Sequence, residues 1–210
     1  MRHVKNLFAA VALVGLMAGF APPALARPAF DALTEDEVVR VDRGEIVVNV
    51  EKSDSAVKHF RVVGQVQASA ARTYRVFTDF ARYDEIFYVK DSKILSATGN
   101  TMHVRATIVV PWPIGSKWVT NETVLSPDDY SFSFQRIDGS IIAYSGNVRI
   151  VPRDTERCDV YYVAKADPGI PFLPAWLLNQ FQASMLPDTI KHVRAYLKRQ
   201  DRLTRRGSMI

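Results

Sequence analysis

The side chains that could carry out chemistry in this chain are few and widely spaced. His59, His103 and His192 lie far apart along the sequence, without the spacing of a metal site. No nucleophile elbow, phosphate-binding loop or dinucleotide fingerprint is present. An enzyme would therefore have to use isolated groups, and His103 and Tyr162 are the candidates for an acid or base. We expect no metal and no other cofactor.

Arg136 is the charged residue best suited to bind an anion. It follows Phe132 and Phe134 at alternate positions, and alternate residues of a strand share one face. A buried arginine has to pair or bind an anion. Arg136 could pair with Glu122, or hold the carboxylate or phosphate of a ligand. Its place beside Asp138-Gly139 also fits an arginine at a strand end that reaches solvent.

Two tyrosines and two tryptophan-bearing loops complete the candidate binding residues. Tyr144 and Tyr162 could orient the polar head of a ligand, or could be ordinary sheet packing. The loop at 111–115 and the loop at 167–176 are apolar and interrupted by prolines. They could form a mobile rim that dips into a membrane interface, or could pack against the body of the protein. Their candidate residues are Trp112, Ile114, Phe172 and Trp176.

The segment from His59 to Leu95 predicts a strand, two short helices and a second strand. Val-rich alternation gives the first strand over His59–Gln67. Ser69 stands where a helix N-cap belongs, and Asp79 is predicted to cap the second helical turn. Two helices inserted between the first strands of an antiparallel sheet suggest a curved sheet around a cavity.

The rest of the chain predicts an antiparallel meander closed by a long helix. Gly99-Asn100 and Asp138-Gly139 are expected to be hairpin turns. The closing segment over 174–199 carries apolar residues along one stripe, with a kink or a short break expected at Pro187 and a cap at Asp188. The predicted strands are Glu45–Glu51, His59–Gln67, Lys90–Ala97, Met102–Val110, Ser116–Leu125, Tyr130–Ile137, Ser140–Val151 and Asp159–Ala166. The stripe residues include Phe181, Met185, Val193 and Leu197.

The N-terminus predicts export. Arg2 and Lys5 precede an apolar run over Leu7–Phe20 and the small-x-small sequence that ends at Ala26. We expect a signal peptide over residues 1–26, cleaved after Ala26, and a periplasmic protein. An uncleaved membrane anchor is the alternative, although the apolar run is short for a span.

The mature part is expected to consist of an N-terminal helical segment, one domain and a basic tail. Thr34 and Glu37 form a capping-box pattern in the segment 27–43. The domain covers 44–199, and the single cysteine, Cys158, is expected to be a buried small hydrophobe, with a reactive thiol as the alternative.

The basic tail, 200–210, is expected to be flexible. The formal net charge of +5 falls to +3 when Arg2 and Lys5 are removed, and the excess gathers near the C-terminus. A solvated helix face or contact with anionic lipid could explain it. Nucleic acid is not expected, because no aromatic residues are interleaved with these charges.

The order of these elements resembles the START-like (SRPBCC) superfamily, with its polyketide-cyclase and ubiquinone-binding branches. The matching segments are Gln67-Ala68-Ser69-Ala70, 76–83, Pro111-Trp112-Pro113 and Asp138-Gly139, followed by the final helix. The resemblance covers Gly44 to Arg199. It implies an α+β helix-grip fold, in which a curved antiparallel sheet wraps round a long C-terminal helix over a hydrophobic cavity. Members bind sterols, phospholipids, quinones, hormones or polyketides, and most are carriers.

The resemblance leaves three hypotheses open. The chain could be an exported carrier of a hydrophobic small molecule, a lipid above all, with transient membrane contact and an undetermined oligomeric state. It could be a cyclase or aromatase, or an interaction protein with a filled core. The residues expected to line the cavity or its rim are Trp112, Ile114, Trp118, Phe132, Phe134, Arg136, Tyr144, Tyr162, Phe172, Trp176, Phe181 and Met185.

Overall fold

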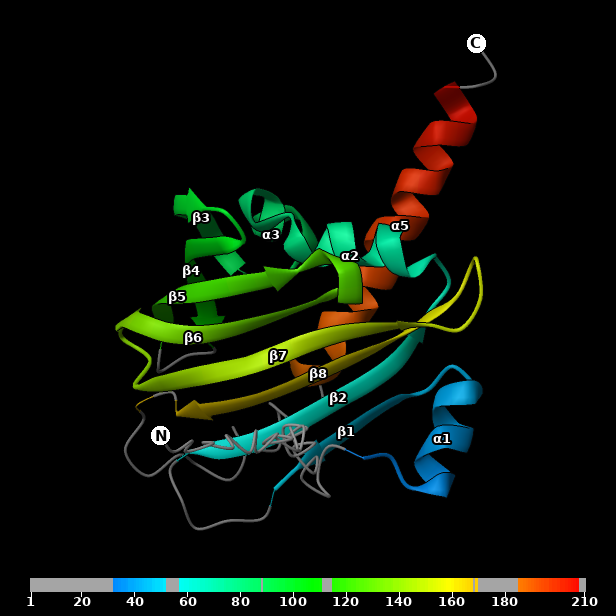
Figure 1. Ribbon diagram of the computed structural model, residues 1–210, viewed down its shortest axis with the longest axis horizontal. Coiled ribbons are helices and arrows are strands. Elements are labelled where there is room, and N and C mark those ends of the chain that lie inside the picture. Colours follow the sequence, from blue (N-terminus) through cyan, green and yellow to red (C-terminus); the bar gives the residue numbers. More distant parts are fainter. Residues whose placement is uncertain are drawn as a thin grey trace, which may run out of the picture.

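The protein is built on one eight-stranded antiparallel sheet with the strand order β1-β2-β8-β7-β6-β5-β4-β3 (Figure 1). The computed structural model describes residues 32–51, 57–87, 89–110, 115–167, 169 and 185–207. The strands are β1 (Ile46–Val50), β2 (Lys58–Val66), β3 (Val89–Thr98), β4 (Thr101–Val110), β5 (Gly115–Ser126), β6 (Ser131–Gly139), β7 (Ala143–Pro152) and β8 (Cys158–Asp167). The helices are α1 (Glu35–Asp42), α2 (Ala70–Thr78), η2 (Phe80–Arg82), α3 (Tyr83–Ile86), η3 (Pro127–Asp129) and α5 (Leu186–Gly207).

This architecture confirms the predicted fold class. Two short helical segments, α2 and the continuous η2–α3, follow the second strand, and a long helix comes last. β3 to β8 form a meander, and β2 joins it by pairing with β8 along its whole length. We call the side of the sheet that faces α2 and α5 the inner face, and the opposite side the outer face.

The helix starts follow the sequence except at one position. Thr34 makes the predicted capping box with Glu37, and Ser69 accepts a hydrogen bond from the Arg72 N–H. Asp79 precedes η2 but makes no side-chain capping bond there, so its predicted cap is wrong. Its carboxylate lies 3.8 Å from the guanidinium of Arg82 instead.

The predicted hairpin turn at Asp138-Gly139 is also wrong. Both residues belong to β6, where they pair with Thr120 and Val119 of β5. A bulge makes this possible, because Ile137 is an extra residue between the pairs on either side of it. The chain turns after Gly139, which has φ of +137°, and a Cβ there would lie 2.5 Å from the Trp118 carbonyl oxygen.

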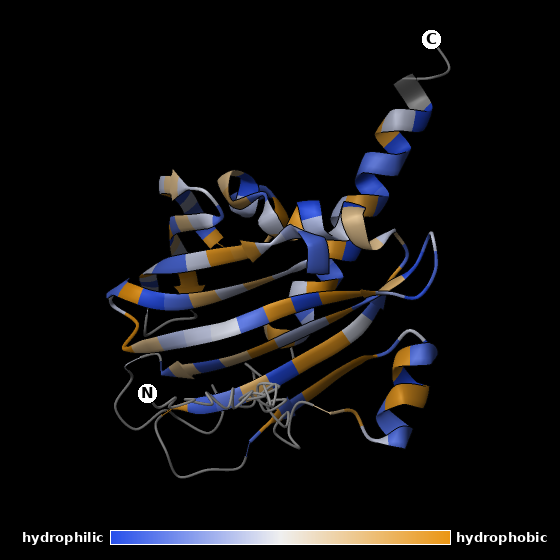
Figure 2. Ribbon diagram, in the orientation of Figure 1, coloured by the Kyte–Doolittle hydropathy of each residue, from blue (hydrophilic) through white to orange (hydrophobic). Residues whose placement is uncertain are grey.

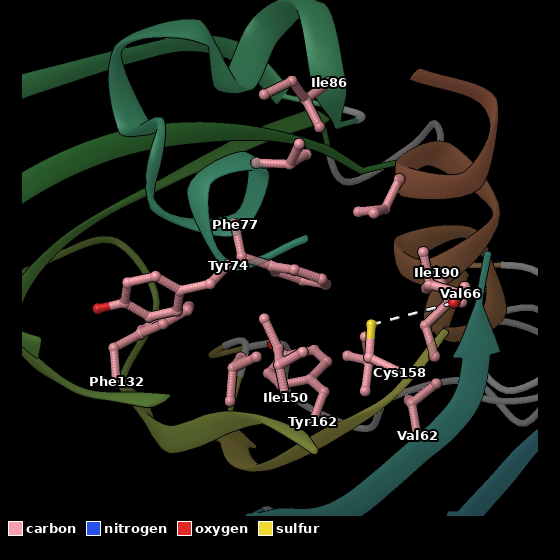
Figure 3. Close-up of a cluster of buried hydrophobic side chains, with 14 of the residues drawn as sticks. Val62, Val66, Tyr74, Phe77, Ile86, Phe132, Ile150, Cys158, Tyr162 and Ile190 are labelled. Atoms are coloured by element: carbon pink, nitrogen blue, oxygen red, sulfur yellow. Dashed lines mark hydrogen bonds between the residues drawn. The ribbon is translucent and has the colours of Figure 1, made fainter. Parts of the chain in front are cut away.

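The core lies between the inner face and the helices α2 and α5. Figure 3 shows Phe77 of α2 above Ile150 and Tyr162 of the sheet, while Tyr74 of the same helix extends toward Phe132. Ile190 of α5 is fully buried and packs directly on Gly64 of β2, where an added Cβ would lie 3.1 Å from the Ile190 Cδ1. Along the strands, hydrophobic and hydrophilic residues alternate, as Figure 2 shows. Cys158 is also fully buried, which confirms its prediction as a small core residue.

The final helix is longer at its C-terminal end than the sequence indicated. Val193 and Leu197 are buried as predicted, but α5 continues to Gly207 and projects beyond the sheet (Figure 1). The helical conformation of residues 200–207 corrects the predicted flexible tail. Pro187 is the second residue of α5, and residues 170–184 lie outside the described part of the chain, so the expected kink or short break at Pro187 stays a prediction. Asp188 pairs with Lys191 at 2.9 Å in the first turn of α5.

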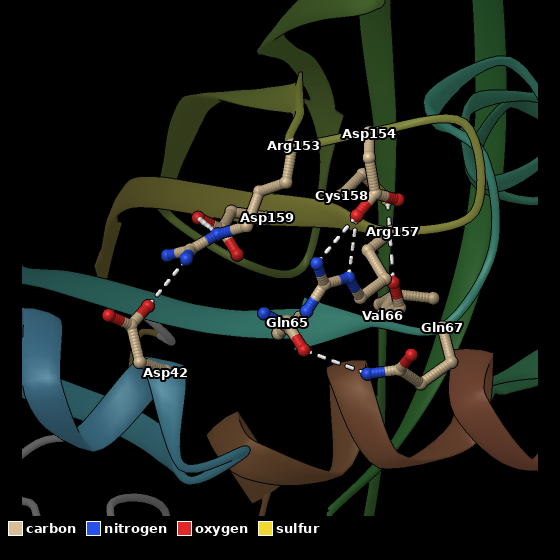
Figure 4. Close-up of polar contacts among 9 residues, drawn as sticks. All are labelled: Asp42, Gln65, Val66, Gln67, Arg153, Asp154, Arg157, Cys158 and Asp159. Atoms are coloured by element: carbon tan, nitrogen blue, oxygen red, sulfur yellow. Dashed lines mark hydrogen bonds and ion pairs between the residues drawn. The ribbon is translucent and has the colours of Figure 1, made fainter.

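Helix α1 covers part of the outer face. Val41 packs there against Val47 and Val63, all three of them buried. Beside them, Arg61 donates to Glu37 at 2.8 Å and to the Ala32 carbonyl oxygen. A second polar link runs from Asp42 through Arg153 to Asp159 (Figure 4). None of the described helices is long and apolar enough to cross a membrane.

Candidate ligand-binding face

Four aromatic rings form the middle of the inner face. Phe132 and Phe134 of β6 are buried, as their alternation predicts. The ring centre of Phe134 lies 4.7 Å from that of Tyr144 on β7 and 6.2 Å from that of Tyr162 on β8. The structure therefore brings four predicted site residues together on three neighbouring strands.

Tyr144 and Tyr162 of this group, together with Tyr83 of α3, are neutral hydrogen-bonding groups. The hydroxyls of Tyr144 and Tyr162 lie 2.5 Å apart, and Tyr83 donates to the Phe77 carbonyl oxygen at 2.5 Å. Burial raises the pKa of Tyr144, and it raises the pKa values of Tyr83 and Tyr162 well above the ordinary range. These phenols keep their protons at neutral pH and can donate hydrogen bonds, but they do not act as bases.

Arg136 lies at the end of the same face. Its Nη2 donates to the Gly139 carbonyl oxygen at 2.9 Å, while its Nε is buried without a hydrogen-bond partner among the described residues. The predicted pairing with Glu122 is wrong, because Glu122 lies on the outer face, 3.5 Å from His103. Arg136 as a whole is partly exposed, as an arginine near a strand end would be, although its Nε is buried.

Two further polar atoms on this face are buried without a partner among the described residues. They are Oδ1 of Asn121 on β5 and Oγ of Ser92 on β3. Asn121 is the cross-strand partner of both Arg136 and Val104, and Ser92 pairs with Ala106. Sequence reasoning missed both residues. For Asn121 the available signal was its alternation with Val119 and Thr123, since side chains two apart share a face.

The other predicted site residues lie elsewhere. Trp118 is on the outer face, where the guanidinium of Arg105 stacks 4.6 Å from its ring centre, so its predicted place in the cavity is wrong. His103 is on the outer face too, which removes it as an acid or base of the inner face. Met185, half-buried, directly precedes α5. Trp112, Ile114, Phe172, Trp176 and Phe181 lie outside the described residues.

The described part of the chain offers weaker alternatives. It contains no cluster of His, Cys, Asp or Glu that could hold a metal ion. A polar groove of about 1270 Å³ lies between α2, the β7–β8 loop and the C-terminal end of α5. Its charges are largely paired, Arg72 with Asp201 and Arg157 with Asp154, each at 2.6 Å. Since its polar groups already have partners, this groove is a poorer candidate than the inner face.

Comparison with known families agrees with this arrangement. The model of the family described as polyketide cyclase / dehydrase and lipid transport matches residues 66–194, more than half of the chain. The chain belongs to this START-like family. The match begins at the end of β2 and includes β3 to β8 and about half of α5. The matched residues therefore include most of those that form the inner face. No curated protein matches the chain.

The solved structures to which this chain is similar include proteins named as a lipid transfer protein and as an aromatase/cyclase. A STAR-related lipid transfer protein from Xanthomonas axonopodis is 23% identical, with a TM-score of 0.60 over 73% of this chain and 93% of that one. The Zhui aromatase/cyclase from a Streptomyces species is 18% identical, with a TM-score of 0.58 over 69% and 95%. Human STARD10 is 14% identical, with a TM-score of 0.58 over 88% and 87%. At these identities the likeness establishes the fold.

Proposed function

We propose that this protein binds a hydrophobic small molecule, a lipid above all, against its inner face and acts as a carrier. The observation that carries the proposal is a set of buried polar atoms on the inner face, on Arg136, Asn121 and Ser92, that have no hydrogen-bond partner among the described residues. A filled structural core satisfies its polar groups, because each unsatisfied one costs about 1 to 3 kcal/mol. A ligand with a polar head would supply the missing partners.

The same residues argue for binding rather than catalysis. A guanidinium stays charged and neutral phenols stay protonated at neutral pH, so Arg136, Tyr144 and Tyr162 do not serve as bases. They are suited to hold a ligand in place. A cyclase or aromatase would need an acid or base within reach of the ligand. The candidate His103 lies on the other side of the sheet, and Tyr162 could serve only as a proton donor.

Transport would depend on apolar burial and on a route to the membrane. Burial contributes about 25 cal/mol for each Å² of apolar surface removed from water. The apolar residues Trp112 and Phe172, with Trp176, would form the rim through which a ligand is exchanged. We further propose that the protein is exported to the periplasm and cleaved after Ala26, on the strength of its N-terminal sequence pattern.

Native mass spectrometry of protein purified from the periplasm, followed by organic extraction, tests the carrier. A retained lipid or isoprenoid supports it and identifies the class of cargo. An empty protein that also fails to bind a panel of lipids would favour an interaction protein with a filled core. The mass of the purified chain tests export, since processing after Ala26 leaves Arg27 as the first residue.

Transfer between vesicles tests the rim. The double variant Trp112→Ala with Trp176→Ala is expected to slow lipid transfer while the thermal unfolding of the protein stays cooperative. Unchanged transfer rates would count against the rim, and the binding proposal would stand independently on the extraction result.

A further inference from the structure

The polar end of the inner face is built around Arg136 and Asn121. The two residues are cross-strand partners between β6 and β5, with no irregularity between this pair and the pair that contains Phe134. Arg136 therefore shares the inner face with the buried Phe132 and Phe134. The Nε of Arg136 and the Oδ1 of Asn121 are both buried, and neither has a hydrogen-bond partner in the described part of the chain.

The charge of Arg136 also has no counter-ion in the described part of the chain. The carboxylates of Glu122 on β5 and Asp138 on β6 are engaged elsewhere: Glu122 lies 3.5 Å from His103, and Asp138 lies 3.7 Å from Arg105 and accepts from the Gly139 N–H. The single hydrogen bond of Arg136, to the Gly139 carbonyl, leaves most of its five N–H donors available. Arg136 as a whole is partly exposed, and an anion bound at this end of the face would give its buried Nε a hydrogen-bond partner.

We propose that Arg136 and Asn121 bind the anionic head group, a carboxylate or a phosphate, of an amphiphilic ligand. This inference rests on the proposed function and specifies its ligand class. A guanidinium matches the geometry of both anions, and a primary amide can turn either its oxygen or its NH₂ toward the head group.

The surroundings of Arg136 fit a hydrocarbon chain attached to that head group. β6 and β7 pair up to Gln135 and Ser145, so the next inner-face residues at this end are Arg136 and Tyr144. The ring of Tyr144 lies 4.7 Å from that of Phe134, and Phe132 follows along the strand. A chain that leaves Arg136 along β6 crosses these rings in turn, with Asn121 beside the head group.

A comparison of three ligands with the same sixteen-carbon chain tests the head group. Palmitate, hexadecyl phosphate and cetyl alcohol are titrated into the wild type and into Arg136→Gln, the two acids below their micelle concentrations and the alcohol below its solubility limit. A charge-assisted hydrogen bond contributes about 1.5 to 3 kcal/mol, so the wild type is expected to bind the preferred acid about tenfold to a hundredfold more tightly than the alcohol. Arg136→Gln is expected to abolish this difference, because the acid loses its charged partner and therefore loses more affinity than the alcohol. The preferred anion distinguishes a carboxylate head group from a phosphate.

Arg105→Gln is the matched control. It removes the same charge from β4, two strands away from β6 and on the outer face, and is expected to keep the preference for the acid. Equal affinity for acid and alcohol in the wild type would overturn the head-group assignment and leave the carrier standing. Absence of binding for all three ligands would count against the carrier itself. If Arg136→Gln does not fold, the difference in affinity between acid and alcohol in the wild type still tests whether the site binds an anionic head group.

Discussion

Two arginines on opposite faces of one sheet have opposite surroundings. Arg61, on the outer face, is 1% exposed and donates to a carboxylate of α1 at 2.8 Å. Arg136, on the inner face, has a buried Nε and only a backbone carbonyl as a partner in the described part of the chain. A charge that serves the fold is paired within the fold, so the difference supports a stabilising role for the outer arginine and the proposal that the inner one binds a ligand.

Replacing Arg61 should have the largest effect. Arg61→Met leaves Glu37, 12% exposed, without its guanidinium, and loss of one partner of a buried pair costs about 3 to 5 kcal/mol. Urea unfolding of the wild type and the variant measures this loss. Arg40→Met is the control, because the Arg40–Glu45 pair is half exposed and should be worth less than about 1 kcal/mol. Equal losses in the two variants would break the comparison.

Acid should weaken the same pair, with a smaller effect. Burial opposes ionisation of Glu37, but hydrogen bonds from Thr34 and Asn49 and the charge of Arg61 together lower its pKa below the ordinary 4.5. A lowered pKa in the folded state stabilises the protein above the ordinary value, and this contribution is lost as the pH falls through the folded-state pKa. The difference in free energy of unfolding between the wild type and Glu37→Gln should therefore be constant near neutral pH and shrink below pH 4.5. A difference that stays constant down to pH 3 would contradict this.

The tyrosine pair should show strong coupling on the inner face. Tyr144→Phe or Tyr162→Phe strands the other hydroxyl and should cost about 1 to 2 kcal/mol. The double variant should cost clearly less than the sum, because it removes both polar groups together. A double-mutant cycle by urea unfolding gives the coupling. Additive losses would show that the hydroxyls already have other partners.

The smallest effect is expected from Arg136→Met in the ligand-free protein. Because Arg136 has no ion pair in the described part of the chain, its loss should change the free energy of unfolding by less than about 1 kcal/mol. A small increase in stability would also agree with this prediction. The measurement uses delipidated protein beside Arg61→Met. A loss as large as that of Arg61→Met would make Arg136 a structural residue and remove the contrast between the faces.

Regular alternation is what made part of this site predictable. Phe132, Phe134 and Arg136 follow the two-residue period of a strand, and all three lie on the inner face. Trp118 follows the same rule on β5, but its face depends on the register between β4 and β5, which no local pattern encodes. The bulge at Ile137 was equally invisible, because one extra residue leaves the hydrophobic pattern before it intact.

The role of Arg61 could not be predicted for a different reason. In the sequence it is an arginine in a Val-rich strand, which reads as a solvent-facing position. It is buried because α1, from an earlier part of the chain, covers it. Burial by a distant element is a tertiary effect, and the capping box at Thr34 and Glu37 predicts the helix without predicting where it packs.

The pairing of β2 with β8 determines when this protein can fold. Val66 pairs with Cys158 and Lys58 with Ala166, so the first hairpin waits for residues about a hundred positions later before it joins the sheet. Contacts this distant along the chain slow folding, because the intervening loop has to close before the contact forms. Until β8 is in place, β2 presents an unpaired, Val-rich edge, which is the kind of surface on which chains aggregate. The nascent protein is therefore most vulnerable just before synthesis of its last strand, and conditions that shield β2 during that interval should raise the yield of folded protein.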